Sequence, residues 1–337
     1  MESSGMPAGI ADAFGLGRVV ACRVVTTGFM NLTWRLTTDR GEFAVKRLTD
    51  RSPEEFEDIQ NLLPRLAERG FPVPLARRTP EGSALLKINN YRYAVSDWRP
   101  GEHPSGAALP LDACAGLGGL IARLHLTLGD LLPAAPTHLA DTPASVDEAR
   151  AALRHYAALH RRTAHPARMT HQEDLAGEID RRLVLLDAIA DRRPAPGRVG
   201  PCGWTHGDLQ SFNLLMAGGR VTGILDWDRM GVRPYAQEVV RTATILFSDG
   251  GRTALDLDRT TALIRGYCAR LPLTRAAVID AAERRRWTLA TETWQLQRHH
   301  DDGDSTCDRL FTARGRFLRW WTENWEEVMR AVCAGCS

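Results

Sequence analysis

Two acidic clusters separated by a predicted turn are the residues of this chain best suited to catalysis. The first cluster lies in residues 204–215 and contains Asp208 and, five residues later, Asn213. The second lies in residues 221–228 and contains Asp226, eighteen residues after Asp208. Apolar residues flank each cluster, which predicts a loop, a strand, a hairpin turn and a second strand that ends at Asp226.

Phosphoryl transfer is the reaction that these residue types at this spacing fit. The protein does little covalent work in such a reaction: it orients a hydroxyl, holds Mg²⁺ against the phosphates and neutralises developing charge. Those tasks need a carboxylate near the hydroxyl, an oxygen ligand beside it and a second carboxylate for the metal ion. We assign Asp208 to the hydroxyl, Asn213 and Asp226 to Mg²⁺, and His206 to bracing the loop. Asp228 either assists the metal ion or caps the turn.

The N-terminal region that must position these groups is predicted to be a small antiparallel sheet with one helix. Short runs rich in Val, Thr and Phe between residues 19 and 45 are broken by turn residues, and two more runs cover 83–88 and 91–95. Ser52 is a capping residue for a helix whose apolar residues recur at helical spacing up to Gly70.

Almost everything after Trp98 is predicted to be helical, apart from the two acidic clusters. The expected helices cover residues 111–128, 145–163, 171–191, 258–270, 274–300 and 308–332. The predicted fold class is therefore α+β, with two lobes. We place an N-lobe at residues 1–97 and a helical C-lobe at residues 98–337.

Charge and composition argue against several functions. The 337 residues include 43 basic and 41 acidic side chains, and the net charge of +2 lacks the strong basic field of a nucleic-acid binder. Seven cysteines without a regular framework are typical of a reducing compartment. The first thirty residues lack the pattern of a secretory signal, and no run of apolar residues is long enough to span a bilayer. We therefore expect a cytoplasmic protein with no membrane or nucleic-acid partner.

The two acidic clusters resemble motifs of a known family. His-Gly-Asp-x-x-x-x-Asn at 206–213 and Ile-Leu-Asp-Trp-Asp at 224–228 are similar to the aminoglycoside phosphotransferase and choline kinase-like group of small-molecule kinases. The resemblance implies a protein-kinase-like fold, ATP and Mg²⁺ as cofactors, and a small hydroxylated acceptor as partner. Gln210 stands where protein kinases usually have lysine, which favours a small-molecule acceptor over a protein.

A kinase also needs a lysine on an N-terminal strand to bind the nucleotide phosphates, and an acid that positions it. Lys46 ends a predicted strand just ahead of the helix that follows Ser52. We choose Glu55 as its partner because this residue lies on the apolar stripe of that helix. The alternative is that Glu55 is a first-turn acid favoured by the helix dipole.

Two further segments are implied to bind ATP by the resemblance alone. Backbone amides from Gly28 to Asn31 would face the phosphates in the turn that covers them. The segment that connects the lobes, at Ser96, Asp97 and Trp98, would hold adenine through its backbone groups.

Other features are interpreted as structural. Residues 116–125 resemble the family's helix that ends in Leu-His, and we expect its glycines to serve close helix packing and His125 to be structural. Cys333 and Cys336 form a Cys-x-x-Cys pair that we interpret as part of a disordered tail. Adjacent His299 and His300 are expected to point apart, in a solvated loop or against a substrate.

The C-terminal helices hold the candidate residues for acceptor binding. Tryptophans gather there and are core residues by default, although one or two could instead line an acceptor pocket. In that case four acids would meet a cationic or polyhydroxylated substrate. These acids are Glu292, Asp301, Asp302 and Asp304.

Three functions are compatible with the sequence. We rank first a phosphotransferase for an antibiotic of the aminoglycoside, nucleoside or peptide type, serving resistance or self-protection, because the C-terminal region is large and rich in aromatic residues. The alternative is a metabolic kinase of the homoserine, choline or methylthioribose type, and residues 55–74 look closest to homoserine kinases. A non-catalytic, pseudokinase-like binding module is disfavoured because every expected catalytic position is filled.

Overall fold

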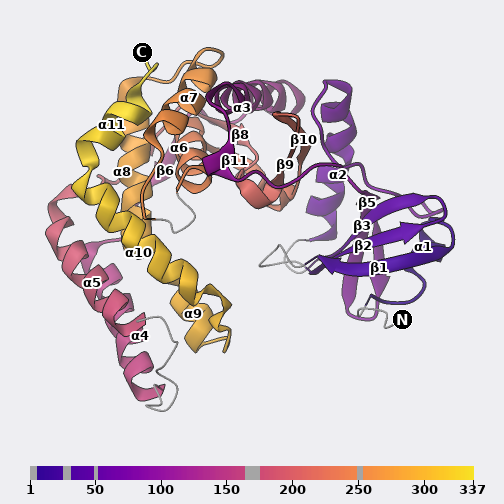
Figure 1. Cartoon of the computed structure of the whole chain (residues 1–337), viewed down its shortest axis with the longest axis horizontal. Helices are drawn as coiled ribbons and strands as arrows, with labels where there is room; N and C mark the ends of the chain where they lie inside the picture. The colour runs from indigo at the N-terminus through magenta and orange to yellow at the C-terminus, as the bar shows by residue number, and fades with distance from the viewer. Residues whose placement is uncertain (1–5, 26–31, 49–51, 164–174, 249–252) are drawn as a thin grey trace. The chain divides into compact units, whose positions relative to one another are not determined.

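The computed structural model describes residues 6–25, 32–48, 52–163, 175–248 and 253–337 (Figure 1). The chain divides into two compact units. Unit 1 comprises Met1–Pro104, Asp130–Pro133 and His206–Met230, and unit 2 comprises Ser105–Gly129, Ala134–Thr205 and Gly231–Ser337. Asp208, Asn213 and Asp226 of the two acidic clusters therefore belong to the same compact unit as the N-terminal region. The lobe boundary after residue 97 stays a prediction.

A five-stranded antiparallel sheet with the order β1-β2-β3-β5-β4 is the main element of unit 1 (Figure 1). Its strands are β1 (Val19–Val25), β2 (Leu32–Thr38), β3 (Gly41–Leu48), β4 (Leu85–Ile88) and β5 (Tyr91–Asp97). Trp34 and Leu36 of β2 and Val45 of β3 are buried and pack with α1 (Ile10–Ala13). This apolar face confirms the expected antiparallel sheet.

Lys46 lies on the opposite face of the sheet from the buried Val45, because successive side chains of a strand alternate. Its strand, β3, is paired on both sides, with Thr33 of β2 and Ala94 of β5 opposite Lys46. A lysine in the middle of a sheet has its backbone fixed by two neighbouring strands. Its ammonium group is therefore presented from a rigid base.

The helix α2 (Pro53–Glu68) packs against the sheet and has the predicted start and stripe. Ser52 Oγ accepts from the backbone N–H of Glu55, while the Glu55 carboxylate accepts from the backbone N–H of Ser52, which makes a capping box. Phe56 at its N-terminal end is buried in a cluster with Leu48 and Ala94 of the sheet.

Unit 2 is mostly helical. Its helices are α3 (Leu111–Leu131), which ends in unit 1, α4 (Val146–Thr163), α5 (Leu175–Ala188), α6 (Tyr235–Leu246), α7 (Leu257–Cys268), α8 (Arg275–Thr291), α9 (Trp294–His300), α10 (Asp308–Glu323) and α11 (Trp325–Cys333). Two short strand pairs, β6 (Leu139–Asp141) with β7 (Gly197–Val199) and β8 (Cys202–Thr205) with β11 (Gly231–Pro234), complete it. The expected helix 274–300 is broken because Glu292 has extended backbone angles, and the expected helix 308–332 is broken at Asn324.

Close contact between α3 and α7 explains Gly118 of α3. A Cβ atom on Gly118 would lie 1.9 Å from the carbonyl oxygen of Leu263, and one on Gly266 would lie 2.0 Å from that of Ala115. The predicted packing role is thereby confirmed for Gly118, whereas a Cβ atom on Gly116 would meet nothing within 4 Å. By length and composition alone, α3 is also the one helix of the described residues that could cross a membrane, but half of that window is buried inside the protein.

Buried polar groups anchor α3 to its neighbours. His125 is fully buried; its Nε2 lies 2.6 Å from Glu238 Oε2 of α6 and its Nδ1 lies 2.9 Å from the Tyr267 hydroxyl of α7. Burial raises the pKa of Tyr267, so this hydroxyl keeps its proton and donates to Nδ1. These contacts agree with the predicted structural role of His125.

The last residues of the chain are ordered against unit 2, so the prediction of a disordered tail is wrong. Cys333 is buried at the end of α11, and the Ser337 carbonyl accepts from the N–H of Arg275 at 2.8 Å. Cys336 Sγ lies 3.6 Å from Cys268 Sγ. Apolar residues of α11 cover α7 and α8, which holds this segment in place.

Candidate active site

The two acidic clusters form one connected structure. The segment η4 (Ser211–Asn213) leads into β9 (Leu214–Ala217), which pairs in antiparallel fashion with β10 (Arg220–Ile224). Asp226 and η5 (Trp227–Arg229) follow β10 directly. The backbone N–H of Leu225 donates to the Asn213 carbonyl at 2.8 Å, so the end of β10 is tied to the loop that carries Asp208. The predicted loop, strand, hairpin and strand are confirmed.

His206 braces the loop through backbone groups. Its Nδ1 accepts from the N–H of Asp208 at 3.3 Å, and its Nε2 lies 3.0 Å from the carbonyl oxygen of Leu225. This pair of contacts requires the neutral tautomer with the proton on Nε2. The ring is fully buried edge-on to Trp227, at 4.7 Å between centroids. His206 therefore connects the two clusters, and its supporting role in phosphoryl transfer stays a prediction.

Asp208 is held in one orientation by two amide groups. Its Oδ2 accepts from Asn213 Nδ2 and from Gln210 Nε2, both at 3.0 Å, and the carboxylate is almost buried. Asn213 Nδ2 also donates to the Asp208 carbonyl at 2.8 Å. The amide nitrogen of Asn213 thus points to Asp208, and its oxygen is the atom with the chemistry of a metal ligand.

Lys46 joins the site from β3. Its Nζ lies 2.8 Å from Asp226 Oδ1 and 2.7 Å from Asp228 Oδ2. Asp226 itself has left-handed backbone angles of φ 60° and ψ 71°, which a residue with a Cβ atom adopts at a cost of about 1–3 kcal/mol. The bond from Trp227 Nε1 to the Ile224 carbonyl, at 3.0 Å, helps to hold this turn.

The electrostatics of these three groups are coupled. Burial lowers the pKa of Lys46, but Asp226 and Asp228 more than reverse this, so its pKa is raised and the ammonium stays charged. Burial also acts to raise the pKa of Asp226, but Lys46 outweighs it and the pKa is lowered. For Asp228, burial and the neighbouring Asp226 together raise the pKa despite Lys46. One ammonium group does not balance the charge of two carboxylates, so a further positive charge can bind at this site.

A magnesium ion suits the donor set. Mg²⁺ prefers oxygen ligands, and Asn213 Oδ1 with the carboxylates of Asp226 and Asp228 supplies three such donors from segments joined by hydrogen bonds. The ionised carboxylates exceed the ammonium in charge. The residues present therefore fit the ion.

The predicted pairing of Lys46 with Glu55 is wrong for this structure. The Glu55 carboxylate is used in the capping box at the start of α2, and Lys46 contacts Asp226 and Asp228 instead. The physical reason is local: a Glu three residues after a capping serine has a backbone N–H within reach. The alternative interpretation, a first-turn acid, describes Glu55 correctly.

The structure describes only some of the other residues predicted to bind ATP. Gly28 and Asn31 lie outside the described residues. Ser96 and Asp97 are paired with Ala44 and Phe43 in the sheet. The backbone N–H of Trp98 donates to the Glu42 carbonyl at 3.0 Å. Their role in holding adenine remains a prediction.

Three of the four acids predicted near an acceptor pair with other side chains of unit 2. Glu292 pairs with Arg314. Asp304 pairs with Arg298 and accepts from the backbone N–H of Thr306. Asp301 accepts from the Tyr156 hydroxyl at 3.2 Å, and Asp302 is exposed. Contact with an acceptor remains a prediction for each. Trp287 and Trp321 are buried, which confirms the core interpretation for these two tryptophans.

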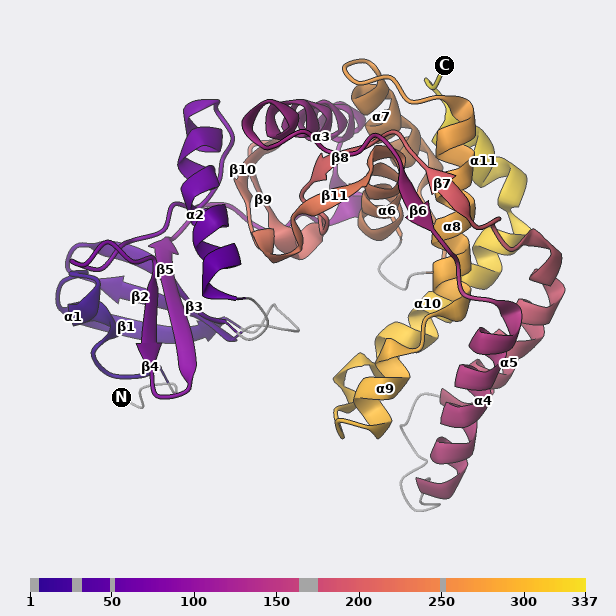
Figure 2. The same cartoon turned by 180° about the vertical axis from the view of Figure 1, so that it is seen from behind.

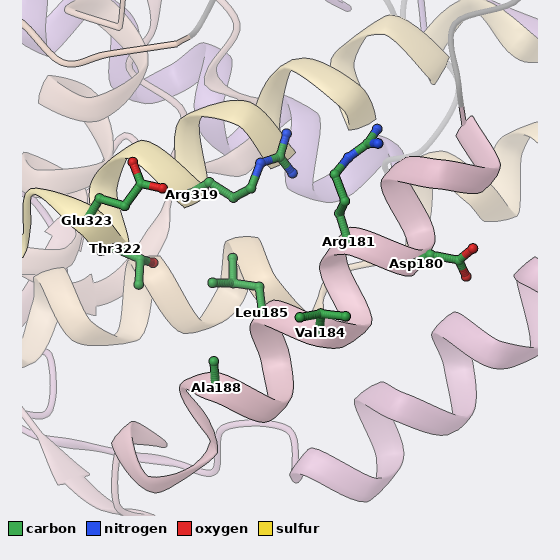
Figure 3. Close-up of a pocket in the computed structure, with 8 residues that line it drawn as sticks. All are labelled: Asp180, Arg181, Val184, Leu185, Ala188, Arg319, Thr322 and Glu323. Atoms are coloured by element: carbon green, nitrogen blue, oxygen red, sulfur yellow. The ribbon is translucent and has the colours of Figure 1, made fainter.

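A surface groove of about 420 Å³ lies between α5 and α10 of unit 2 (Figure 3). Val184 and Leu185 supply apolar lining, and Figure 3 shows Arg181 and Arg319 turned to the same side of it. Both arginines contact Glu178. The groove contains none of the residues predicted to act in phosphoryl transfer.

Gln210 is a supporting residue whose contact with Asp208 the sequence did not reveal. Its side chain follows Asp208 by two residues and turns back to donate to its carboxylate. The signal available was the replacement of the lysine usual in protein kinases, which we used only to judge the acceptor. An amide is a donor of suitable length for the same carboxylate.

The comparisons with known proteins show to which family the chain belongs. Residues 21–273 match the model of the phosphotransferase enzyme family (APH), so the chain belongs to that family. It is 28% identical over 289 residues to a homoserine kinase of Burkholderia multivorans, covering 82% of this chain and 77% of that protein.

Solved structures show the same fold. An aminoglycoside phosphotransferase from Alicyclobacillus acidocaldarius matches with a TM-score of 0.63 at 13% identity, covering 99% of this chain and 96% of that one. The amicoumacin kinase hAmiN, in complex with AMP-PNP, Ca²⁺ and Ami, matches with a TM-score of 0.55 at 15% identity, covering 87% and 86%. The predicted protein-kinase-like α+β fold is confirmed, and the protein is a small-molecule phosphotransferase.

Proposed function

We propose that this protein transfers the γ-phosphoryl group of ATP to a hydroxyl of a small molecule, with Mg²⁺ bound. The observation that carries the proposal is the convergence of Lys46, Asp226 and Asp228 within 2.8 Å contacts, tied by the bond between Leu225 and Asn213 to the loop of Asp208. These are the parts that phosphoryl transfer requires. We also propose the lobes at residues 1–97 and 98–337 and a cytoplasmic location, where ATP is available.

Each residue of the site has a separate proposed role in phosphoryl transfer. Asp208, oriented by Asn213 and Gln210, accepts the proton of the acceptor hydroxyl. Asn213 Oδ1 and Asp226 are the proposed Mg²⁺ ligands, with Asp228 assisting; the ion neutralises charge on the phosphates when bound. Lys46 supplies a fixed positive charge for the nucleotide phosphates. The nucleotide analogue in hAmiN supports ATP as the donor.

For the acceptor, we place a metabolic hydroxy-amino acid of the homoserine type first. The support is the 28% identity to a homoserine kinase over most of both chains. The earlier reason for ranking an antibiotic first was the aromatic C-terminal region, and the burial of Trp287 and Trp321 weakens it. Antibiotics are the second candidate, and the aminoglycoside and amicoumacin kinases share only the fold with this chain.

The test is ADP release with ATP and Mg²⁺ against homoserine, choline, methylthioribose and a set of aminoglycoside, nucleoside and peptide antibiotics. We expect turnover with homoserine or a close analogue, lowered about 10²–10⁴-fold in Asp208→Asn, because a general base contributes on that scale. Asp147→Asn, which removes a carboxylate 91% exposed, is the matched control and should be fully active.

Other outcomes have defined meanings. Turnover of an antibiotic alone would replace the first acceptor class by the second. ATP binding without turnover of any acceptor would favour the non-catalytic alternative. Full activity of Asp208→Asn would refute the assigned role of this residue.

A further inference from the structure

Three histidines gather outside the phosphotransfer site, where α4 packs against α9 in unit 2 (Figures 1 and 2). His160 belongs to α4, and His299 and His300 end α9. One ring nitrogen of each lies within 4.8 Å of one ring nitrogen of both others. The expectation that His299 and His300 point apart is wrong: their ring centroids are 4.4 Å apart.

The cluster is enclosed by both helices. The His160 ring lies 5.8 Å from that of His299 and 5.5 Å from that of His300, between centroids. Tyr156 of α4 stacks on His300 at 5.9 Å with an interplanar angle of 18°. All three histidines are partly buried. The rings therefore have restricted freedom to turn outward to solvent.

One hydrogen bond leaves a ring nitrogen of His299 available to a metal ion. His299 Nδ1 lies 2.8 Å from Asp308 Oδ2, so this nitrogen carries the proton and Nε2 is left as a lone-pair donor. A carboxylate behind a histidine is the usual outer partner of a metal-binding imidazole. His300 Nε2 is buried and has no hydrogen-bond partner among the described residues.

A buried ring nitrogen without a partner is unfavourable, and a metal ion would satisfy it. Imidazole binds a metal ion in its neutral form, through the ring nitrogen that carries no proton. The arrangement has the ligand type, the number and the outer carboxylate of a three-histidine centre.

We propose that His160, His299 and His300 bind one divalent transition-metal ion of the zinc class. Three imidazoles and a water molecule complete a tetrahedral zinc site, and imidazole favours Zn²⁺ over the oxygen-seeking Mg²⁺. Zinc–nitrogen bonds of about 2.0–2.1 Å place the nitrogens of a tetrahedral site roughly 3.3–3.4 Å apart. The ring nitrogens, which lie within 4.8 Å of one another, would therefore approach by up to about 1.5 Å on binding. The ion would crosslink α4 to α9 and is independent of the magnesium site in unit 1.

The experiment is a titration of the full chain, without a histidine tag and stripped by a chelator, with Zn²⁺ in excess Mg²⁺. A chromogenic zinc chelator gives the stoichiometry and affinity by competition. We expect one equivalent bound, at least tenfold more weakly in His160→Ala and in His300→Ala. His138→Ala, which removes an exposed histidine of the same unit, is the matched control and should bind as the parent does.

Binding of a second metal, Co²⁺, distinguishes the three-histidine site from other metal-binding groups of the chain, such as thiols. Bound Co²⁺ should give the visible absorption of a tetrahedral nitrogen site, and this band should be lost in His300→Ala and in His160→Gln, which keeps a side chain of similar length. Cys336→Ser is measured in parallel because the thiols of Cys268 and Cys336 are 3.6 Å apart.

The proposal is overturned if the parent binds no equivalent of Zn²⁺, if the histidine variants bind as tightly as the parent, or if Cys336→Ser alone abolishes binding. Circular dichroism of each variant shows whether it folds. If the alanine variants do not fold, the parent titration and His160→Gln still decide the matter.

Discussion

Removing the amide of Gln210 tests how Asp208 is positioned. Gln210→Ala loses the 3.0 Å hydrogen bond to Asp208 Oδ2 and leaves the bond from Asn213 in place. Hydrogen bonds to charged groups contribute about 1.5–3 kcal/mol, and the half-buried Gln210 belongs at the lower end. At about 1.4 kcal/mol per factor of ten, this predicts a loss of about tenfold in kcat.

The assay is steady-state ADP release at saturating acceptor, with kcat and the KM for ATP determined separately. We expect kcat to fall while the KM for ATP stays within about twofold, because Gln210 acts through Asp208 rather than on the nucleotide. Gln210→Glu should be worse, since it places a second carboxylate beside the first. Combined with Asp208→Asn, Gln210→Ala should add little further loss. An unchanged kcat, or an effect confined to the KM for ATP, would refute the reasoning.

Three further predictions concern stability in unit 2. Glu238→Ala leaves Nε2 of the buried His125 without its 2.6 Å partner. Because a neutral buried donor then has no acceptor, the free energy of unfolding should fall by about 1–3 kcal/mol in denaturant titrations, whereas Glu238→Gln, which keeps an acceptor, should lose less. Gly315→Ala would place a Cβ atom 1.6 Å from Glu178 Oε1, and moving this buried carboxylate off Arg319 should destabilise by about 1–3 kcal/mol; an unchanged Tm would contradict the contact. Cys268 and Cys336, whose sulfur atoms lie 3.6 Å apart, should form a disulfide with oxidised glutathione, which takes up the two electrons and two protons that the thiols lose. The disulfide would close a loop of 68 positions and should raise the free energy of unfolding by about 4 kcal/mol. Cys336→Ser should show no such gain.

The arrangement of the segment proposed to be catalytic could be predicted from the sequence because its information is local. Asp208, Asn213 and Asp226 lie within nineteen residues, and the apolar strands between them fix their order in space. The sheet could be predicted for the same reason, since alternating burial along β2 and β3 follows directly from alternating residue types.

The partner of Lys46 could not be predicted because it depends on a contact over 180 positions of the chain. Periodicity placed Glu55 on the favourable side of its helix, but a capping interaction three residues away was the stronger local influence. Similarly, the histidine cluster depends on the packing of α4 against α9, which adjacent positions in the sequence do not encode.

The conformation of Asp226 separates what this protein needs for chemistry from what it needs for folding. Asparagine and glycine occupy the left-handed region more readily than aspartate does, so Asp226→Asn or Asp226→Gly relieves backbone strain while removing a carboxylate from Lys46. With the proposed metal-binding role of Asp226, such a change would abolish turnover while it relieves backbone strain, so the inactive chain should remain folded. Loss of turnover and loss of protein are separate events at residue 226.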